Sequence, residues 1–314
     1  MDYPVLFNHL PVVQWLHANR KEGCTAEALE FAARHGYLEI LQWLHLHRPG
    51  GWSTNVMDTA ASNGHLHVVQ WLHAHRREGC TTRAMDYAAM DGHMDVVQWL
   101  HHNRSEGCTT EAMDSAATNG HLDIVKWLHR NTKARCSTKA MDEAATNGHL
   151  NVVQWLYANT NAGCTAKAID GAATNGHLGI VKWLHACRTE GCTVTAMDGA
   201  AENGFLPVVR WLHRNRNEGC SEKAMTRAAY NGHLPIVEWL HVHRSQECSV
   251  PAIEEAALCN NFEVVLFLHY QRHEKYTSKI AVQSYENGSP EIHEWIIQRY
   301  PEYREAVEAE HGQD

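Results

Sequence analysis

The apolar positions of the chain recur with a fixed spacing, which tryptophan marks most clearly. One tryptophan column has a period of 28 residues and contains Trp15, Trp43, Trp71, Trp99, Trp127, Trp155, Trp183, Trp211 and Trp239. Phe267 and Trp295 continue the same register. A period of this length is the signature of one supersecondary unit copied along the chain. The pattern therefore predicts about eleven stacked units. A stack of this kind needs no single large core, because each unit packs only on its neighbours.

Each unit contains two segments with the apolar pattern of a helix. When the unit is numbered from its first hydroxyl residue, for example Thr109, positions 4, 5, 8 and 9 read Ala-Met-x-x-Ala-Ala. This spacing places the apolar side chains on one helical stripe. Serine or threonine at position 1 predicts an N-cap. Glycine at position 12 predicts the left-handed residue that ends the helix.

The second helix is predicted to begin near position 14. Proline or an acidic residue at position 15 is typical of a first helical turn. Apolar residues at positions 14, 16, 17, 19 and 20 cover more than one side of this helix, which indicates a helix packed between neighbours. In one unit these residues are Leu122, Ile124, Val125, Trp127 and Leu128. Positions 24–28, typically Arg-x-Glu-Gly-Cys, form a short connection to the next unit.

The unit resembles an ankyrin repeat. The segment 119–125 holds the family's Gly-His and its Ile/Val-Val core, and Ala116 and Ala117 match the family's paired alanines. The resemblance implies an all-α, ankyrin-like solenoid of about eleven helix–turn–helix units over roughly residues 1–304. The family's repeat has about 33 residues, and the shortening falls between the second helix and the next first helix. We therefore expect short loops there, with little or no β-hairpin.

The pattern also predicts the domain organisation. Residues 1–304 are one repeat array, in which 1–24 form a partial N-terminal capping unit and 25–276 form nine full units. Residues 277–304 form a degenerate capping unit, and 305–314 form a polar C-terminal tail. Atypical, more polar end units are what a finite stack needs to cover its apolar ends.

Composition restricts the partners and the compartment. The formal net charge is −9 without a block of basic residues, which argues against a nucleic-acid partner. No apolar run approaches the roughly 20 residues that cross a membrane, and the N-terminus does not read as a signal peptide. We expect a monomer in the cytosol or the nucleus.

Eight of the ten cysteines occupy position 28, where successive copies should lie roughly 8–10 Å apart, beyond the reach of a disulfide. We expect buried free thiols in a reducing compartment. The column consists of Cys24, Cys80, Cys108, Cys136, Cys164, Cys192, Cys220 and Cys248.

The 25 histidines are the main candidates for chemistry, and most fall into two columns. One column follows glycine, and the other follows Trp-Leu. A column with one histidine per unit spreads possible metal ligands instead of bringing them together. We therefore interpret the columns as structural and predict no metal and no cofactor. A metal- or pH-responsive protein that uses these histidines remains the alternative. The segment His185-x-Cys187-x₄-Cys192 is a weak metal signal.

Aspartate recurs at position 6, at Asp58, Asp86, Asp114, Asp142, Asp170 and Asp198. A catalytic group normally breaks a repeat pattern once, whereas this aspartate is part of the pattern. We interpret the column as a hydrogen-bonding ladder and predict that the protein is not an enzyme.

Recognition is predicted at the positions that vary between units. Positions 3, 7 and 10 share one face of the first helix. The resemblance implies that this face lines a concave groove that binds a protein partner, so the protein is predicted to be a non-catalytic protein–protein interaction scaffold. Aromatic, methionine and arginine side chains are the expected anchors. They are Phe31, Arg34, Arg83, Tyr87, Met90, Arg227 and Tyr230. Ser115 and Thr118 occupy the same face in a central unit, and unselected variation on a solvated face is the alternative.

Overall fold

A computed structural model of the chain describes residues 2–20, 25–48, 50–244, 252–273, 277–286, 289–305 and 307. The predictions for Cys24, Cys248 and the tail residues 308–314 lie outside these residues. The chain divides into two compact units. One contains Met1–Ala144 and His149–Cys164, and the other contains Ala145–Gly148 and Thr165–Asp314.

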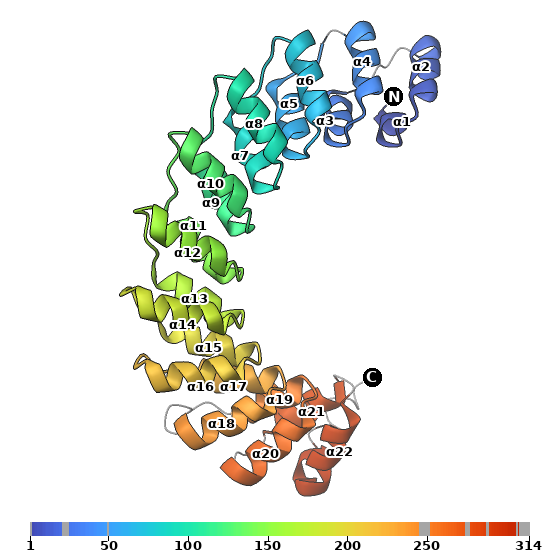
Figure 1. Cartoon of the computed structure of the whole chain (residues 1–314). Helices are drawn as coiled ribbons and strands as arrows, with labels where there is room; N and C mark the ends of the chain where they lie inside the picture. Colours follow the sequence, from blue (N-terminus) through green and yellow to red (C-terminus); the bar gives the residue numbers. More distant parts are fainter. Residues whose placement is uncertain are drawn as a thin grey trace. The chain divides into compact units, whose positions relative to one another are not determined.

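The described residues form an all-α repeat array, as predicted (Figure 1). The first helices of the repeats are α1 (Asp2–Leu6), α3 (Ala26–Arg34), α5 (Thr54–Ser62), α7 (Thr82–Met90), α9 (Thr110–Thr118), α11 (Thr138–Thr146), α13 (Ala166–Thr174), α15 (Val194–Glu202), α17 (Lys223–Tyr230), α19 (Ala252–Leu258) and α21 (Ser278–Glu286). The second helices are α2 (Leu10–Asn19), α4 (Leu38–His47), α6 (Leu66–His75), α8 (Met94–Asn103), α10 (Leu122–Asn131), α12 (Leu150–Asn159), α14 (Leu178–Cys187), α16 (Leu206–Asn215), α18 (Leu234–Arg244), α20 (Phe262–Arg272) and α22 (Pro290–Arg299). A 3₁₀ turn, Pro301–Tyr303, follows α22. No strand occurs in the part of the chain that the structure describes, which confirms the expected loss of the hairpin.

First helices pack against the next first helix and against the second helix of their own repeat, as α7 does against α9 and α8. The core between them consists of the predicted columns. Ala116, Met113, Ile124 and Leu128 each have no exposed surface. Trp127, in the tryptophan column, is half-buried.

The helix ends also follow the predicted signals. Gly120 has a φ of 80°, its N–H donates to the Ala117 carbonyl (3.1 Å), and the His121 N–H donates to the Ala116 carbonyl (2.9 Å). This pair of bonds is a Schellman motif, which a residue without a Cβ forms at least cost. At the other end the Thr109 hydroxyl accepts from the Glu111 N–H (3.1 Å).

The hydroxyl caps occur in most, but not all, of the described first helices. The side chains of Thr25 and Ser53 make no such bond.

Candidate functional site

The histidine that follows glycine packs on the glycine of the preceding repeat. A Cβ added to Gly36 would lie 2.7 Å from Nδ1 of His65. The His65 ring is held there by a hydrogen bond between its Nε2 and the Arg34 carbonyl (2.8 Å). Asn261 occupies the equivalent position later in the chain, and its amide donates to the Tyr230 carbonyl (2.6 Å). This column therefore ties each repeat to the end of the preceding first helix.

The histidine that follows Trp-Leu contacts the tryptophan of the next repeat. In these pairs, from His17–Trp43 to His269–Trp295 and with Phe267 in place of tryptophan beside His241, ring centroids are 4.9–5.6 Å apart and the rings are nearly perpendicular. Such edge-to-face pairs are favourable aromatic contacts. Nδ1 of His45 also accepts from Arg76 (3.2 Å). Both histidine columns thus serve packing between repeats.

The aspartate column is the predicted hydrogen-bonding ladder. Asp86 is 4% exposed and accepts from the Thr109 N–H (2.8 Å) and hydroxyl (2.9 Å). Asp58, Asp114, Asp170 and Asp198 bind the cap residue of the next repeat in the same way. Burial raises the pKa of Asp58, Asp86 and Asp170, and the two hydrogen bonds offset only part of this effect. Each of these five aspartates connects one first helix to the start of the next.

The cysteine column consists of free thiols wherever it is described. Burial raises the pKa of Cys80 and Cys192 to about 11, so these groups are thiols rather than nucleophilic thiolates at neutral pH. Among the described residues, no group of three or more His, Cys, Asp or Glu side chains converges on a possible metal position. This holds also for the segment with His185, Cys187 and Cys192.

Acidification is expected to destabilise the protein through His65. Burial lowers the pKa of His65 below 6.5, and the nearby His67, His93 and His35 act in the same direction. The unfolded chain therefore takes up this proton first, so stability falls as the pH falls below about 6.5. The raised pKa values of Asp58, Asp86 and Asp170 have the opposite effect on stability, because protonation of these groups favours the folded state. This effect sets in at a lower pH than the titration of His65. We expect the melting temperature to fall between pH 7.5 and pH 5.5.

The matched control is His65→Asn, because Asn261 shows that asparagine can make the same bond. This variant should have a shallower pH dependence than the wild type. A wild-type melting temperature that does not change over this range would contradict the expectation.

Three of the predicted anchors come together on the first-helix face of one compact unit. Arg34 of α3, Arg83 of α7 and Tyr87 of α7 line one depression of about 290 Å³, with polar residues of α5 between them. Tyr87 is 38% exposed, and both arginines are exposed. The depression therefore presents one aromatic side chain and two guanidinium groups to solvent, from the two repeats that flank the α5 repeat.

Phe31 and Met90 are less exposed than the other predicted anchors. Both residues are half-buried, and the Phe31 ring packs against the His35 ring, with centroids 4.2 Å apart. The Met90 carbonyl accepts from the Asn119 amide (2.8 Å). These two residues lie on the predicted face, but the structure does not include them in the depression.

Arg227 and Tyr230 line a depression of the other compact unit, also of about 290 Å³, together with Thr226 and Glu255. Tyr230 is 46% exposed. The Arg227 guanidinium already forms an ion pair with Glu202 (2.7 Å). An approaching acidic group would have to compete with this carboxylate.

Between these clusters the varied positions have structural roles. Ser115 is only 7% exposed, and its hydroxyl donates to Glu111 (3.0 Å). A Cβ on Gly171 would overlap the Thr146 side chain, and Gly199 faces Thr174 in the same way. Small residues at position 7 thus let adjacent first helices approach, and Ser115 is not an accessible recognition residue.

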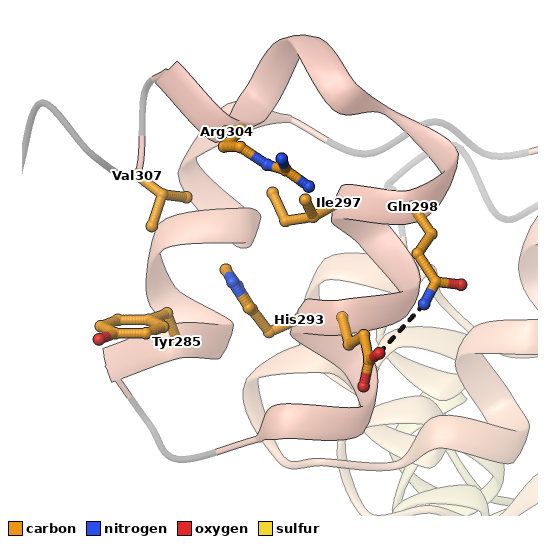
Figure 2. A pocket seen from close by; sticks show the side chains of 7 residues that line it. Tyr285, His293, Ile297, Gln298, Arg304 and Val307 are labelled. Atoms are coloured by element: carbon orange, nitrogen blue, oxygen red, sulfur yellow. Dashed lines mark hydrogen bonds between the residues drawn. The ribbon is translucent and has the colours of Figure 1, made fainter.

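The sequence did not indicate the cavity of about 570 Å³ beside α22. Tyr285, His293, Ile297, Arg304 and Val307 surround it, and Gln298 donates to Glu294 at its rim (Figure 2). The His293 ring is bonded through Nδ1 to the Ala281 carbonyl (3.0 Å) and lies 5.2 Å from the Tyr285 ring. Because the end of the chain beyond it is outside the described residues, we assign this cavity no function.

The fold and its columns define a helical repeat protein whose constant positions join neighbouring repeats. Models of ankyrin repeats match residues 2–45, 85–129 and 200–241 (many copies) and residues 113–198 (three copies). Together they span well over half of the chain, which therefore belongs to the ankyrin-repeat family. Ankyrin repeats are in general protein–protein interaction modules, and proteins built from them are typically non-catalytic.

No curated protein matches the chain beyond chance. Within the described residues, no helix has both the length and the apolar character that crossing a lipid bilayer requires.

Proposed function

We propose that the protein is a non-catalytic, cytoplasmic scaffold that binds a protein partner on its first-helix face. By the repeat pattern, residues 1–304 act as one array and the terminal repeats as caps. The observation that carries the proposal is the depression in which Arg34, Arg83 and Tyr87 meet. Tyrosine and arginine are the side chains most often found as binding anchors. Helices joined by the aspartate and histidine columns present them on a pre-organised surface, which lowers the entropic cost of binding.

Phe31 and Met90 complete the proposed face in the first compact unit, and Arg227 and Tyr230 are the candidate anchors of the second unit. Tyr230 is the best secondary anchor, since Arg227 has an internal ion-pair partner and the other two side chains are partly covered. The polar residues of α5 between Arg34 and Arg83 supply hydrogen-bonding groups rather than catalytic ones.

Site-specific photo-crosslinking tests the position of this surface. A photoreactive phenylalanine at position 87 should form adducts with the partner, first in extract and then with the purified partner. The same group at position 46 is the control, because Leu46 is 76% exposed but lies on second helix α4. Adducts of the purified partner from position 46 alone would show that the partner binds elsewhere.

A further inference from the structure

In four of the described repeats, an arginine and a glutamate fill the space between consecutive loops. The ion pairs are Arg76–Glu78, Arg104–Glu106, Arg188–Glu190 and Arg216–Glu218. These arginine side chains are only 15–23% exposed. Arg104 also donates to Nδ1 of His73 in the preceding repeat (3.4 Å). Each such gap is therefore occupied, and its charges are neutralised from within.

Two consecutive repeats have lost both members of the pair. Threonine and alanine replace them, as Thr132 and Ala134 and then as Thr160 and Ala162. The Thr160 hydroxyl donates to the Leu156 carbonyl of its own helix (2.8 Å) and also lies within hydrogen-bonding distance of the Cys136 thiol, but it is too short to fill the gap as an arginine would. In the second of these gaps the structure has a cavity of about 410 Å³ between the two loops.

The lining of this cavity is positively charged. Arg135 occupies position 27, where neighbouring repeats have glycine, and it is the one charged side chain of the lining residues. No carboxylate pairs with it among the described residues. The segment 124–141 around it has five basic and no acidic residues, in a chain whose net charge is −9. A charged group that remains without a counter-ion favours an anion brought by a partner.

Hydrogen-bonding groups complete the lining. Asn159 ends α12, Thr160 and Asn161 follow in the loop after it, and Cys136 comes from the preceding loop. His129 keeps the edge-to-face contact with Trp155 (5.3 Å, 85°), so the ring edge that meets arginine in other repeats is left to the cavity. A carboxylate here would accept bonds from Arg135, from the imidazole and from the asparagine amides.

We propose that this cavity is a second recognition site, which binds a carboxylate side chain from an acidic peptide segment of a protein partner. The carboxylate replaces the missing glutamate and pairs with Arg135. Guanidinium–carboxylate pairs are bidentate and geometrically specific, so the site selects acidic side chains over neutral ones of the same shape. The site lies on the loop side of the repeats and does not depend on the proposed first-helix surface.

The test uses an end-blocked octaglutamate peptide, with octaglutamine as the neutral probe, and the full chain. Octaglutamate should bind at least about tenfold more tightly than octaglutamine. Arg135→Gly introduces the glycine that neighbouring repeats have at this position. It should weaken the binding of octaglutamate at least about tenfold. The double variant T160R/A162E rebuilds the internal ion pair, fills the cavity and should lose binding by a similar factor. Unchanged circular dichroism and melting temperature show that the variants fold.

The control is Arg130→Ala, which removes a charge from the same segment but not from the cavity lining. It should change the affinity by less than about twofold, because its guanidinium does not line the cavity and physiological salt screens charges that act from a distance. Equal losses in Arg130→Ala and Arg135→Gly, or full binding by T160R/A162E, would overturn the proposal. Inorganic phosphate that competes at micromolar concentration would indicate a small-anion site instead. Binding of a single-stranded oligonucleotide to the wild type but not to T160R/A162E would contradict a protein partner at this site.

Discussion

Gly36→Ala is expected to lower the free energy of unfolding by about 3 kcal/mol, because two costs add. Gly36 has a φ of 71°, where an alanine costs about 1–2 kcal/mol. The new methyl group would also meet the His65 ring at 2.7 Å, and overpacking of this kind costs about 1–3 kcal/mol. The ring cannot turn away without losing its bond to the Arg34 carbonyl.

Gly107→Ala separates the two costs. Gly107 has nearly the same φ, 70°, but no atom lies within 4 Å of the added Cβ. This variant should lose only about 1 kcal/mol, from the backbone term alone. Urea titration measures both variants, and hydrogen exchange should place the effect of Gly36→Ala in α3–α6. Equal losses in both variants would mean that the histidine contact contributes nothing.

Asp86→Ala is expected to cost about 2 kcal/mol, because it leaves the Thr109 N–H without its acceptor at the start of α9. The effect of Asp86→Asn should be much smaller. Burial raises the pKa of Asp86, which means that its surroundings penalise the charge, and asparagine keeps an acceptor without that charge. The ladder therefore requires the oxygen rather than the carboxylate.

Urea titrations of Asp86→Ala and Asp86→Asn at pH 7 provide the comparison. If both variants were destabilised equally, the negative charge itself would be the stabilising feature, and the interpretation of the ladder would be wrong.

The sequence predicted the parts of this fold that depend on spacing within one repeat. The position 1 hydroxyl, the position 12 glycine and the apolar stripes each act within a few residues, so their periods identify the helices and their ends. The described members of the histidine columns lie at contacts between repeats.

Contacts between repeats could not be predicted in the same way. Gly-His reads as a local pair, yet Gly64, which His65 follows, is covered by the ring of His93 from the next repeat. Likewise Asp86 binds Thr109, 23 residues away, and not a group in its own helix. These partners depend on how far each repeat is rotated on the next, which spacing does not determine.

The recognition face was only partly predictable for the same reason. Variation between repeats drew attention to Ser115 and Arg83 alike, but only the second is exposed, since the first is covered by packing between helices. The cavity beside Arg135 was visible in the sequence as the joint loss of an arginine and a glutamate. Its significance depended on the structure, which shows that these two side chains fill the gap in other repeats.

The sharpest test of the first-helix surface is the dissociation constant of the purified partner for three forms of the protein. These are the wild type, the double variant R83A/Y87A and the control Leu46→Ala. Removing both anchors should weaken binding at least about thirtyfold, since each anchor contributes about 1 kcal/mol or more. Leu46→Ala should change it less than about twofold, since that side chain is outside the depression. Equal affinities for the wild type and R83A/Y87A, with both proteins folded, would contradict a binding surface on this face.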